Sequence, residues 1–263
     1  MLVDLAEKPP ADNQLLTAQL NSRTPREVPE YALREYLSGR IQIICSAHNA
    51  LLSAESVQEA VLAISKVGGF AARKNFGKIT ELMSALNALW TQNQALTPEE
   101  AKREILQDLK LQAAKRWARA KRPDPLGYVQ HLTCLNGKGL ALDSTSGAIR
   151  GPNDSFTCDP AERCAAALYM YGKTAELGKV CDALHPNKLD AAAAAKQENS
   201  GRRKTLKSLI ADGPDKFNKG RCRGLGDAYF AVMCPAGSDV LTSNTVDHAI
   251  LCNAVGLKAV KAP

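Results

Sequence analysis

The chain has 263 residues, of which 45% are hydrophobic and 23% charged, and its formal net charge is +7. This composition predicts a soluble globular protein with one large domain or two ordinary ones. No apolar stretch approaches the roughly 18 residues that a membrane span needs, and the first residues include acids where a secretory signal peptide is basic. We therefore expect a cytoplasmic protein without a membrane partner.

The cysteines argue against two further kinds of site. The chain has eight of them, with no C-x-x-C pair and no regularly spaced histidine partners, a pattern that does not favour zinc. Disulfide frameworks are typical of short secreted chains. We expect buried free thiols, which pack as small apolar side chains.

Residues 1–28 are polar and interrupted by prolines, which predicts a flexible or loosely docked arm. Helical patterns follow, so we expect an all-α domain over residues 29–125. Within it, Ser56 and Glu59 have the spacing of a capping box that opens a helix.

The clearest helix start in the chain is the segment Thr97-Pro98-Glu99-Glu100. It combines an N-cap threonine, a proline at the first helical position and a glutamate that closes the box. The helix should extend to about Arg122, and Pro123 and Pro125 then predict a domain boundary. Its expected buried face consists of Ile105, Leu106, Leu109, Ala113 and Trp117.

Residues 132–263 have a different pattern, in which short apolar segments alternate with helix-like ones. The segments KGLALDS, AALYMYG and DVLTSN are predicted to be strands. Short apolar strands separated by helices predict an α/β fold with a parallel sheet.

Four acids follow these predicted strands or open helices. Asp143 ends the first strand, Glu176 lies in a helix start after the second, Asp227 opens a later apolar segment, and Asp247 follows the third strand. Functional groups of parallel sheets gather outside the carboxyl ends of the strands. Taken singly, each acid is also explained as a cap or as a partner of the helix dipole.

The order of the motifs LALDSTSG, LYMYGKTAELGKV, GLGDAYFAVM and VLTSNTVDH resembles the PIN domain, a family of metal-dependent nucleases that includes ribonuclease toxins. The resemblance extends from about Leu132 to the C-terminus. It implies a three-layer domain with a central, mainly parallel sheet over residues 132–263. The chain departs from the family pattern at Asp143-Ser144-Thr145, where Asp-Thr-Asn or Asp-Thr-Ser is usual, and at His248, where an aromatic residue is common.

The resemblance also implies a metal site. Mg²⁺ and Mn²⁺ are hard cations that prefer carboxylate oxygens, and a metal held by such groups activates water for attack on a phosphodiester. The implied catalytic and metal-binding residues are Asp143, Glu176, Asp227 and Asp247. Side chains that would hold these carboxylates or bound waters in place are Ser144, Thr242 and Asn244.

Two basic segments, over residues 110–122 and 196–223, are candidates for contact with a phosphate backbone. The first choice is Arg202, Arg203 and Lys204, which lie in the PIN-like half, and the second choice is Lys115, Arg116 and Arg119. For each segment the alternative is a solvated helix face. In the first segment, the helix dipole alone could explain the basic residues.

We therefore expect a metal-dependent endonuclease that cuts RNA with Mg²⁺ or Mn²⁺, as a toxin or defence effector. Its helical domain would mediate oligomerisation, bind an inhibitor or sense a trigger protein, and its sequence does not choose among these roles. The family suggests a homo-oligomer. One alternative is a DNA endonuclease with the same site, because the acids do not read the 2′-hydroxyl. A second alternative is a non-catalytic binding or scaffold module whose acids are caps. Histidine-based catalysis is not favoured, because no histidine lies beside a nucleophile motif.

Overall fold

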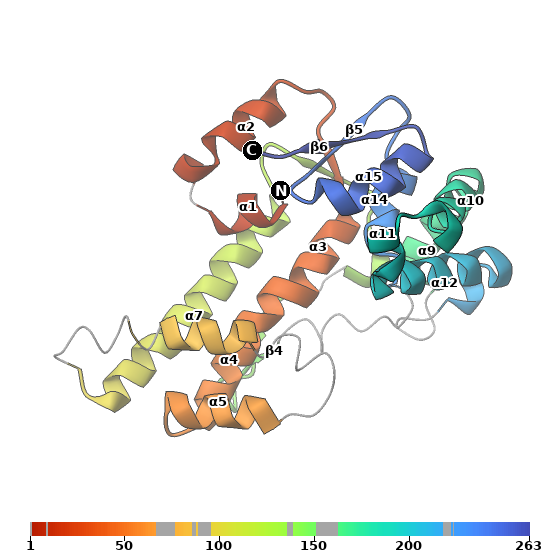
Figure 1. The fold of residues 1–263 in the computed structure, drawn as a ribbon. Coiled ribbons are helices and arrows are strands. Elements are labelled where there is room, and N and C mark those ends of the chain that lie inside the picture. Colours follow the sequence, from red (N-terminus) through yellow and green to blue (C-terminus); the bar gives the residue numbers. More distant parts are fainter. Residues whose placement is uncertain are drawn as a thin grey trace. The chain divides into compact units, whose positions relative to one another are not determined.

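The computed structural model describes residues 2–8, 10–66, 77–85, 88, 96–135, 139–150, 163–217, 222 and 224–263. The chain divides into two compact units. Unit 1 comprises Met1–Ala32, Asp124–Asn136 and Thr157–Pro263, and unit 2 comprises Leu33–Pro123 and Gly137–Phe156. The fold is mostly helical with short strands (Figure 1). No helix among the described residues is long and apolar enough to cross a membrane.

The division differs from the predicted one in two places. Residues 1–32 belong with the C-terminal part of the chain, and residues 137–156 belong with the helical part. The chain passes from unit 2 to unit 1 at Pro123, where the sequence predicts a boundary.

Unit 2 is built on helices α4 (Gln42–Ser53) and α7 (Pro98–Lys121), which pack against each other. Helix α7 begins with the predicted capping box, in which Thr97 Oγ1 accepts from the Glu100 amide and the Glu100 carboxylate accepts from the Thr97 amide. Its predicted length is confirmed, and most of its predicted face is buried. The elements of unit 2 are the end of α3 (Glu30–Tyr36), η2 (Leu37–Ile41), α4 (Gln42–Ser53), α5 (Val57–Lys66), α7 (Pro98–Lys121), β3 (Ala141–Leu142) and β4 (Ile149–Arg150).

Unit 1 contains the remaining elements. Its N-terminal part has α1 (Leu2–Glu7), η1 (Pro10–Asn13), α2 (Gln14–Asn21), β1 (Glu27–Pro29) and the start of α3, followed by β2 (Gly127–Val129) and η3 (Thr133–Leu135). Its C-terminal part has α9 (Ala165–Tyr171), α10 (Thr174–Ala183), η4 (Pro186–Lys188), α11 (Ala191–Ala195), α12 (Gln197–Asp212), η5 (Pro214–Lys216), α14 (Ala228–Met233), β5 (Asp239–Thr242), α15 (Thr245–Ala254) and β6 (Lys258–Lys261).

The end of the chain forms a β-α-β unit. Strands β5 and β6 pair in parallel, with Asp239 opposite Lys258 and Thr242 opposite Lys261, and α15 connects them. Helix α15 buries Leu251 and Cys252, and Figure 1 shows it beside both strands. The predicted strand DVLTSN is therefore confirmed.

The N-terminal segment is packed, although its polar composition predicts an arm. Leu16 and Leu20 of α2 form a buried cluster with Val28, Leu126 and Ala262. Strand β1 pairs in parallel with β2. Several apolar residues of this segment are thus buried against the rest of unit 1, although Leu15 is exposed.

The predicted central parallel sheet is not formed by the described residues, which instead make three separate two-stranded sheets. The prediction that AALYMYG is a strand is wrong, because these residues form α9. Alanine, leucine and methionine favour helix. The buried residues Ala166, Ala167 and Met170 have helical spacing.

Candidate acid network

Asp227 precedes α14 but does not cap it. It occupies the N-cap position, yet its side chain makes no capping hydrogen bond. Instead, Oδ2 accepts from Nη2 of Arg202 at 2.9 Å, and Oδ1 lies 3.5 Å from Nε2 of His248. The carboxylate is therefore held by side chains from α12 and α15, and the explanation of Asp227 as a helix cap does not apply.

Asp247 lies in the first turn of α15, just after β5. Its carboxylate accepts from Nζ of Lys196 at 2.5 Å and from Nδ2 of Asn244 at 2.7 Å. The Asn244 side chain in turn caps α15 by accepting from the Asp247 amide, and Thr242 Oγ1 accepts from the Asn244 amide. The short turn after the strand thus fixes the position of this acid.

The two aspartates belong to one electrostatic cluster. Asp247 and His248 are neighbours in α15, and the charge of Arg202 acts on both of them. Arg202 also donates from Nη1 to Oδ1 of Asn199, at 3.2 Å. We call this cluster the acid network, and its members are Lys196, Asn199, Arg202, Asp227, Asn244, Asp247 and His248.

The titration of the acid network follows from these contacts. The hydrogen bonds from Lys196 and Asn244 lower the pKa of Asp247 below its ordinary value. Burial lowers the pKa of His248, although the Asp227 carboxylate partly offsets this effect. His248 is therefore neutral in the folded protein at pH 7.

The buried histidine gives a testable dependence of stability on pH. Because the folded-state pKa of His248 lies below the ordinary histidine value of 6.5, the unfolded chain takes up a proton first as the pH falls. The free energy of unfolding should therefore decrease below about pH 6.5. Urea titrations followed by circular dichroism should show a smaller decrease in His248→Asn than in the wild type, and an equal decrease in both would contradict this assignment.

Tyr31 of α3 supports the segment that leads to Asp227. Its hydroxyl donates to the Cys222 carbonyl at 2.9 Å and accepts from the Gly226 amide at 3.2 Å. Its ring stacks on that of Tyr229, with centroids 4.6 Å apart. Tyr31 is fully buried, so it links α3, the turn before Asp227 and α14.

The two glycines before Asp227 have separate structural reasons. A Cβ at Gly224 would lie 2.3 Å from Thr205 Oγ1 of α12, so only a glycine lets this turn approach the helix. Gly226 has a φ of +47°, in the left-handed region that other residues disfavour. The Gly-x-Gly-Asp pattern thus places Asp227 beside α12.

Gly226→Ala is expected to destabilise unit 1 by about 1–2 kcal/mol, the cost of a left-handed conformation for an L-residue. Hydrogen exchange of peptides covering α14 should become faster. Gly178→Ala is a suitable control, because a Cβ there would meet no atom within 4 Å. Equal exchange rates in the two variants would contradict the conformational explanation.

Asp143 belongs to unit 2, whereas the other three predicted acids belong to unit 1. It follows β3, as expected, but β3 pairs with β4 as an antiparallel hairpin. Its carboxylate accepts from the amides of Thr145 and Ser146 and forms an ion pair with Arg150. These interactions lower its pKa far below the ordinary range. The structure therefore shows Asp143 organising its own turn.

The other predicted site residues lie as follows. Glu176 is in the first turn of α10, as expected, and is half-buried. Thr242 is buried beside the acid network through its contact with Asn244. Ser144 is exposed in the hairpin turn of unit 2.

The predicted nucleic-acid contacts fall into three groups. Arg202 is only 11% exposed and binds Asp227, so its guanidinium is part of the acid network. Arg203 and Lys204 follow it on α12, where Arg203 is half-buried and Lys204 is exposed. The second-choice residues lie on α7 in unit 2, and they are Lys115, Arg116 and Arg119.

The donor chemistry of the acid network is suited to a hard cation, but its carboxylates are bound to side-chain cations. In the described part of the chain, no group of three His, Cys, Asp or Glu side chains is placed to hold a metal ion. The Asp227 and Asp247 oxygens are ligands of the kind that Mg²⁺ and Mn²⁺ prefer. A metal ion would take the place of Arg202 or Lys196 as their counter-charge.

Sequence reasoning missed four residues of this region. Lys196 begins one of the predicted basic segments but is not among the contact residues chosen from it. Asn199 belongs to no motif, and no nucleophile motif lies beside His248. Tyr31 was invisible because it comes from a distant segment. Lys196 and Arg202 share one usable signal, because Lys196 is the N-cap residue of α12 and Arg202 lies within the same helix.

The chain was compared with known protein families, curated proteins and solved structures. The chain matches no protein-family model, and it has no significant match among curated proteins or solved structures.

Proposed function

We propose that unit 1 is a PIN-like, metal-dependent endonuclease domain that cuts RNA. The observation that carries the proposal is the position of Asp227, whose carboxylate leaves its helix uncapped and faces Arg202 and His248. A second acid, Asp247, follows the parallel strand β5 and lies in the same network. Caps and dipole partners would not need this convergence.

The residues that would hold Mg²⁺ or Mn²⁺ are Asp227 and Asp247. Lys196 and Arg202 balance the charges of the Asp247 and Asp227 carboxylates, and a divalent ion can supply this positive charge instead. Asn244 positions Asp247 and Thr242 positions Asn244. When bound, the metal would lower the pKa of a coordinated water and stabilise charge on the leaving oxygen.

Glu176 completes the carboxylate set within unit 1, whereas Asp143, which the family resemblance also implies, belongs to unit 2. Glu176 belongs to α10, which packs against α14 and α15, so the proposal includes it as a ligand or water-orienting base. Asp143 is satisfied within its own hairpin.

RNA would approach along α12, where Lys204 is exposed and Arg203 is half-buried. This choice favours α12 over α7 because α12 also supplies Arg202 to the acid network. The 2′-hydroxyl is not read by carboxylates, so DNA is the alternative substrate.

The proposal is tested by incubating the full chain with single-stranded RNA, single-stranded DNA and duplex DNA, each with Mn²⁺ or with a chelator. The expected result is cleavage of RNA that requires Mn²⁺. Cleavage that persists in chelator would contradict a metal-dependent site. Preferential cleavage of DNA would show that DNA, and not RNA, is the substrate. No cleavage of any substrate over a range of Mn²⁺ concentrations would favour the scaffold alternative.

A further inference from the structure

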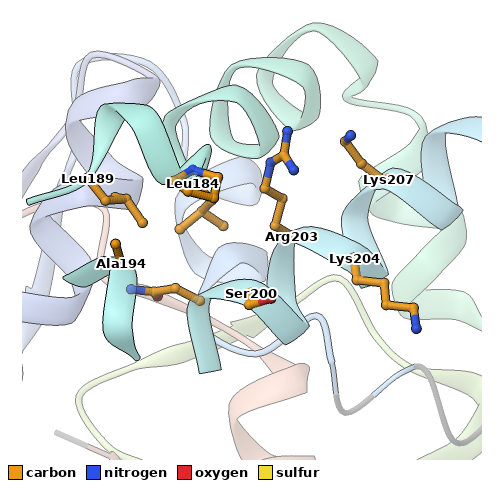
Figure 2. Close-up of a pocket in the computed structure, with 9 residues that line it drawn as sticks. Leu184, Leu189, Ala194, Ser200, Arg203, Lys204 and Lys207 are labelled. Atoms are coloured by element: carbon orange, nitrogen blue, oxygen red, sulfur yellow. The ribbon is translucent and has the colours of Figure 1, made fainter. Parts of the chain in front are cut away.

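A cavity of about 260 Å³ lies in unit 1 beside the first half of α12 (Figure 2). One side is apolar and includes Leu184, Pro186 and Leu189, from the segment between α10 and α11. The other side is formed by α12 and includes Arg203 and Lys207. The cavity therefore presents an apolar surface opposite a positive one.

The charged side of the cavity has no acid among the described residues that line it. Figure 2 shows the Arg203 and Lys207 side chains extending to the same side of α12, while Lys204 points away. The nearby acid on α10 is Asp182, which forms an ion pair with Lys188. An anion in the cavity would thus be attracted by Arg203 and Lys207 together.

Arg203 has a donor ready for such an anion. Its Nε is buried and has no hydrogen-bond partner in the described structure. A buried donor without an acceptor costs free energy, which an oxyanion ligand would recover. A planar guanidinium matches the paired oxygens of a phosphate group.

The cavity adjoins the acid network through one residue. Asn199 lines the cavity, and its Oδ1 accepts from Nη1 of Arg202, which also donates to Asp227. Helix α12 therefore directs Arg202 to the acid network and Arg203 to the cavity. The volume of the cavity lies just below the roughly 300–1,000 Å³ of pockets for drug-sized ligands. A cavity of this size suits one nucleotide better than several.

We propose that this cavity binds a nucleoside monophosphate unit, with the phosphate on Arg203 and Lys207 and the sugar or base against Leu184, Pro186 and Leu189. The choice of a nucleotide among phosphorylated compounds rests on the nuclease function proposed above. A free nucleotide and one unit of a strand both present a phosphate joined to a sugar and a base. Binding of either one to the cavity requires no cleavage.

Calorimetric titration of the full chain in chelator tests the proposal with four probes: adenosine or uridine monophosphate, an RNA tetranucleotide, inorganic phosphate and glucose 6-phosphate. A nucleoside monophosphate is expected to bind at least about tenfold more tightly than inorganic phosphate, because apolar burial adds to the charge interaction. Tighter binding of the tetranucleotide would identify a strand as the ligand, and equal binding would identify the free nucleotide.

Variants assign the binding to this cavity. Lys207→Gln, an exposed position, and Leu189→Ser should each weaken nucleotide binding by about tenfold. Lys216→Gln is the control, because Lys216 is exposed on η5 and does not line the cavity.

The proposal is overturned if no probe binds saturably, if glucose 6-phosphate binds as tightly as the nucleotide, or if Lys207→Gln binds like Lys216→Gln. Since the titration contains no metal, its failure leaves the proposed cleavage intact. Conversely, if the chain binds nucleotide but does not cut RNA, the proposed cleavage is contradicted and the proposed nucleotide binding stands.

Discussion

Asp227→Asn is expected to lower the rate of Mn²⁺-dependent RNA cleavage by at least about 100-fold, the scale on which losing one charge-stabilising group acts in other active sites. Asparagine keeps the shape of the side chain and can still bond to Arg202 or His248. It removes the negative charge that a hard cation requires. The initial rate of cleavage of a fluorescent RNA, at saturating Mn²⁺, measures the effect.

The matched control is Asp239→Asn. Asp239 is also an aspartate of unit 1 that is paired with an arginine, because Arg23 Nη1 donates to its carboxylate at 2.8 Å. It begins β5 and is not a member of the acid network. Its replacement should leave the rate within about twofold of wild type, since surface ion pairs contribute little. Equal rates in the two variants would show that Asp227 has no special role.

Tyr31→Ala is expected to lower the free energy of unfolding of unit 1 by about 3–5 kcal/mol, the usual cost of truncating a large buried aromatic side chain. The variant loses the stacking on Tyr229. It also loses the hydroxyl that binds both the Cys222 carbonyl and the Gly226 amide. Tyr31→Phe keeps the ring and should cost about 1–3 kcal/mol.

Hydrogen exchange is the appropriate measurement for Tyr31, because it reports on peptides of unit 1, whereas the fluorescence of Trp117 reports on unit 2. Peptides covering residues 224–233 should exchange faster in both Tyr31 variants, and RNA cleavage should fall with them. Tyr171→Phe, at an exposed tyrosine of α9, should stay within about 0.5 kcal/mol of wild type. If Tyr31→Phe behaved like Tyr171→Phe, the hydroxyl would not support the turn before Asp227.

Local signals predicted several elements well. The capping box at Thr97 and the helical spacing of Ile105, Leu109 and Trp117 fixed α7, because both effects act within a few residues along the chain. The strand DVLTSN was recognised for the same reason. In contrast, AALYMYG is short and apolar throughout, so the spacing of its apolar residues does not distinguish a strand from a helix. The segment forms a helix that buries three residues.

The candidate site was predictable only in part, because its contacts span long separations in the sequence. The motifs named Asp227, Asp247, Thr242 and Asn244, and the structure places all four in or beside one cluster. Arg202 and Lys196, which bind the two aspartates, come from α12 and its N-cap, and the support from Tyr31 comes from 195 residues away. Pairing between such distant segments follows from the folded packing and leaves no local pattern.

Binding of Mn²⁺ itself tests the central claim most directly, because it depends neither on the substrate nor on a trigger. Titration of the purified chain with Mn²⁺, followed by the electron paramagnetic resonance of the free ion, should reveal a saturable site in the wild type. That site should be lost in Asp227→Asn and retained in Asp239→Asn. A wild-type chain without saturable binding, or an Asp227→Asn variant that binds Mn²⁺ like the wild type, would contradict a metal site at the acid network.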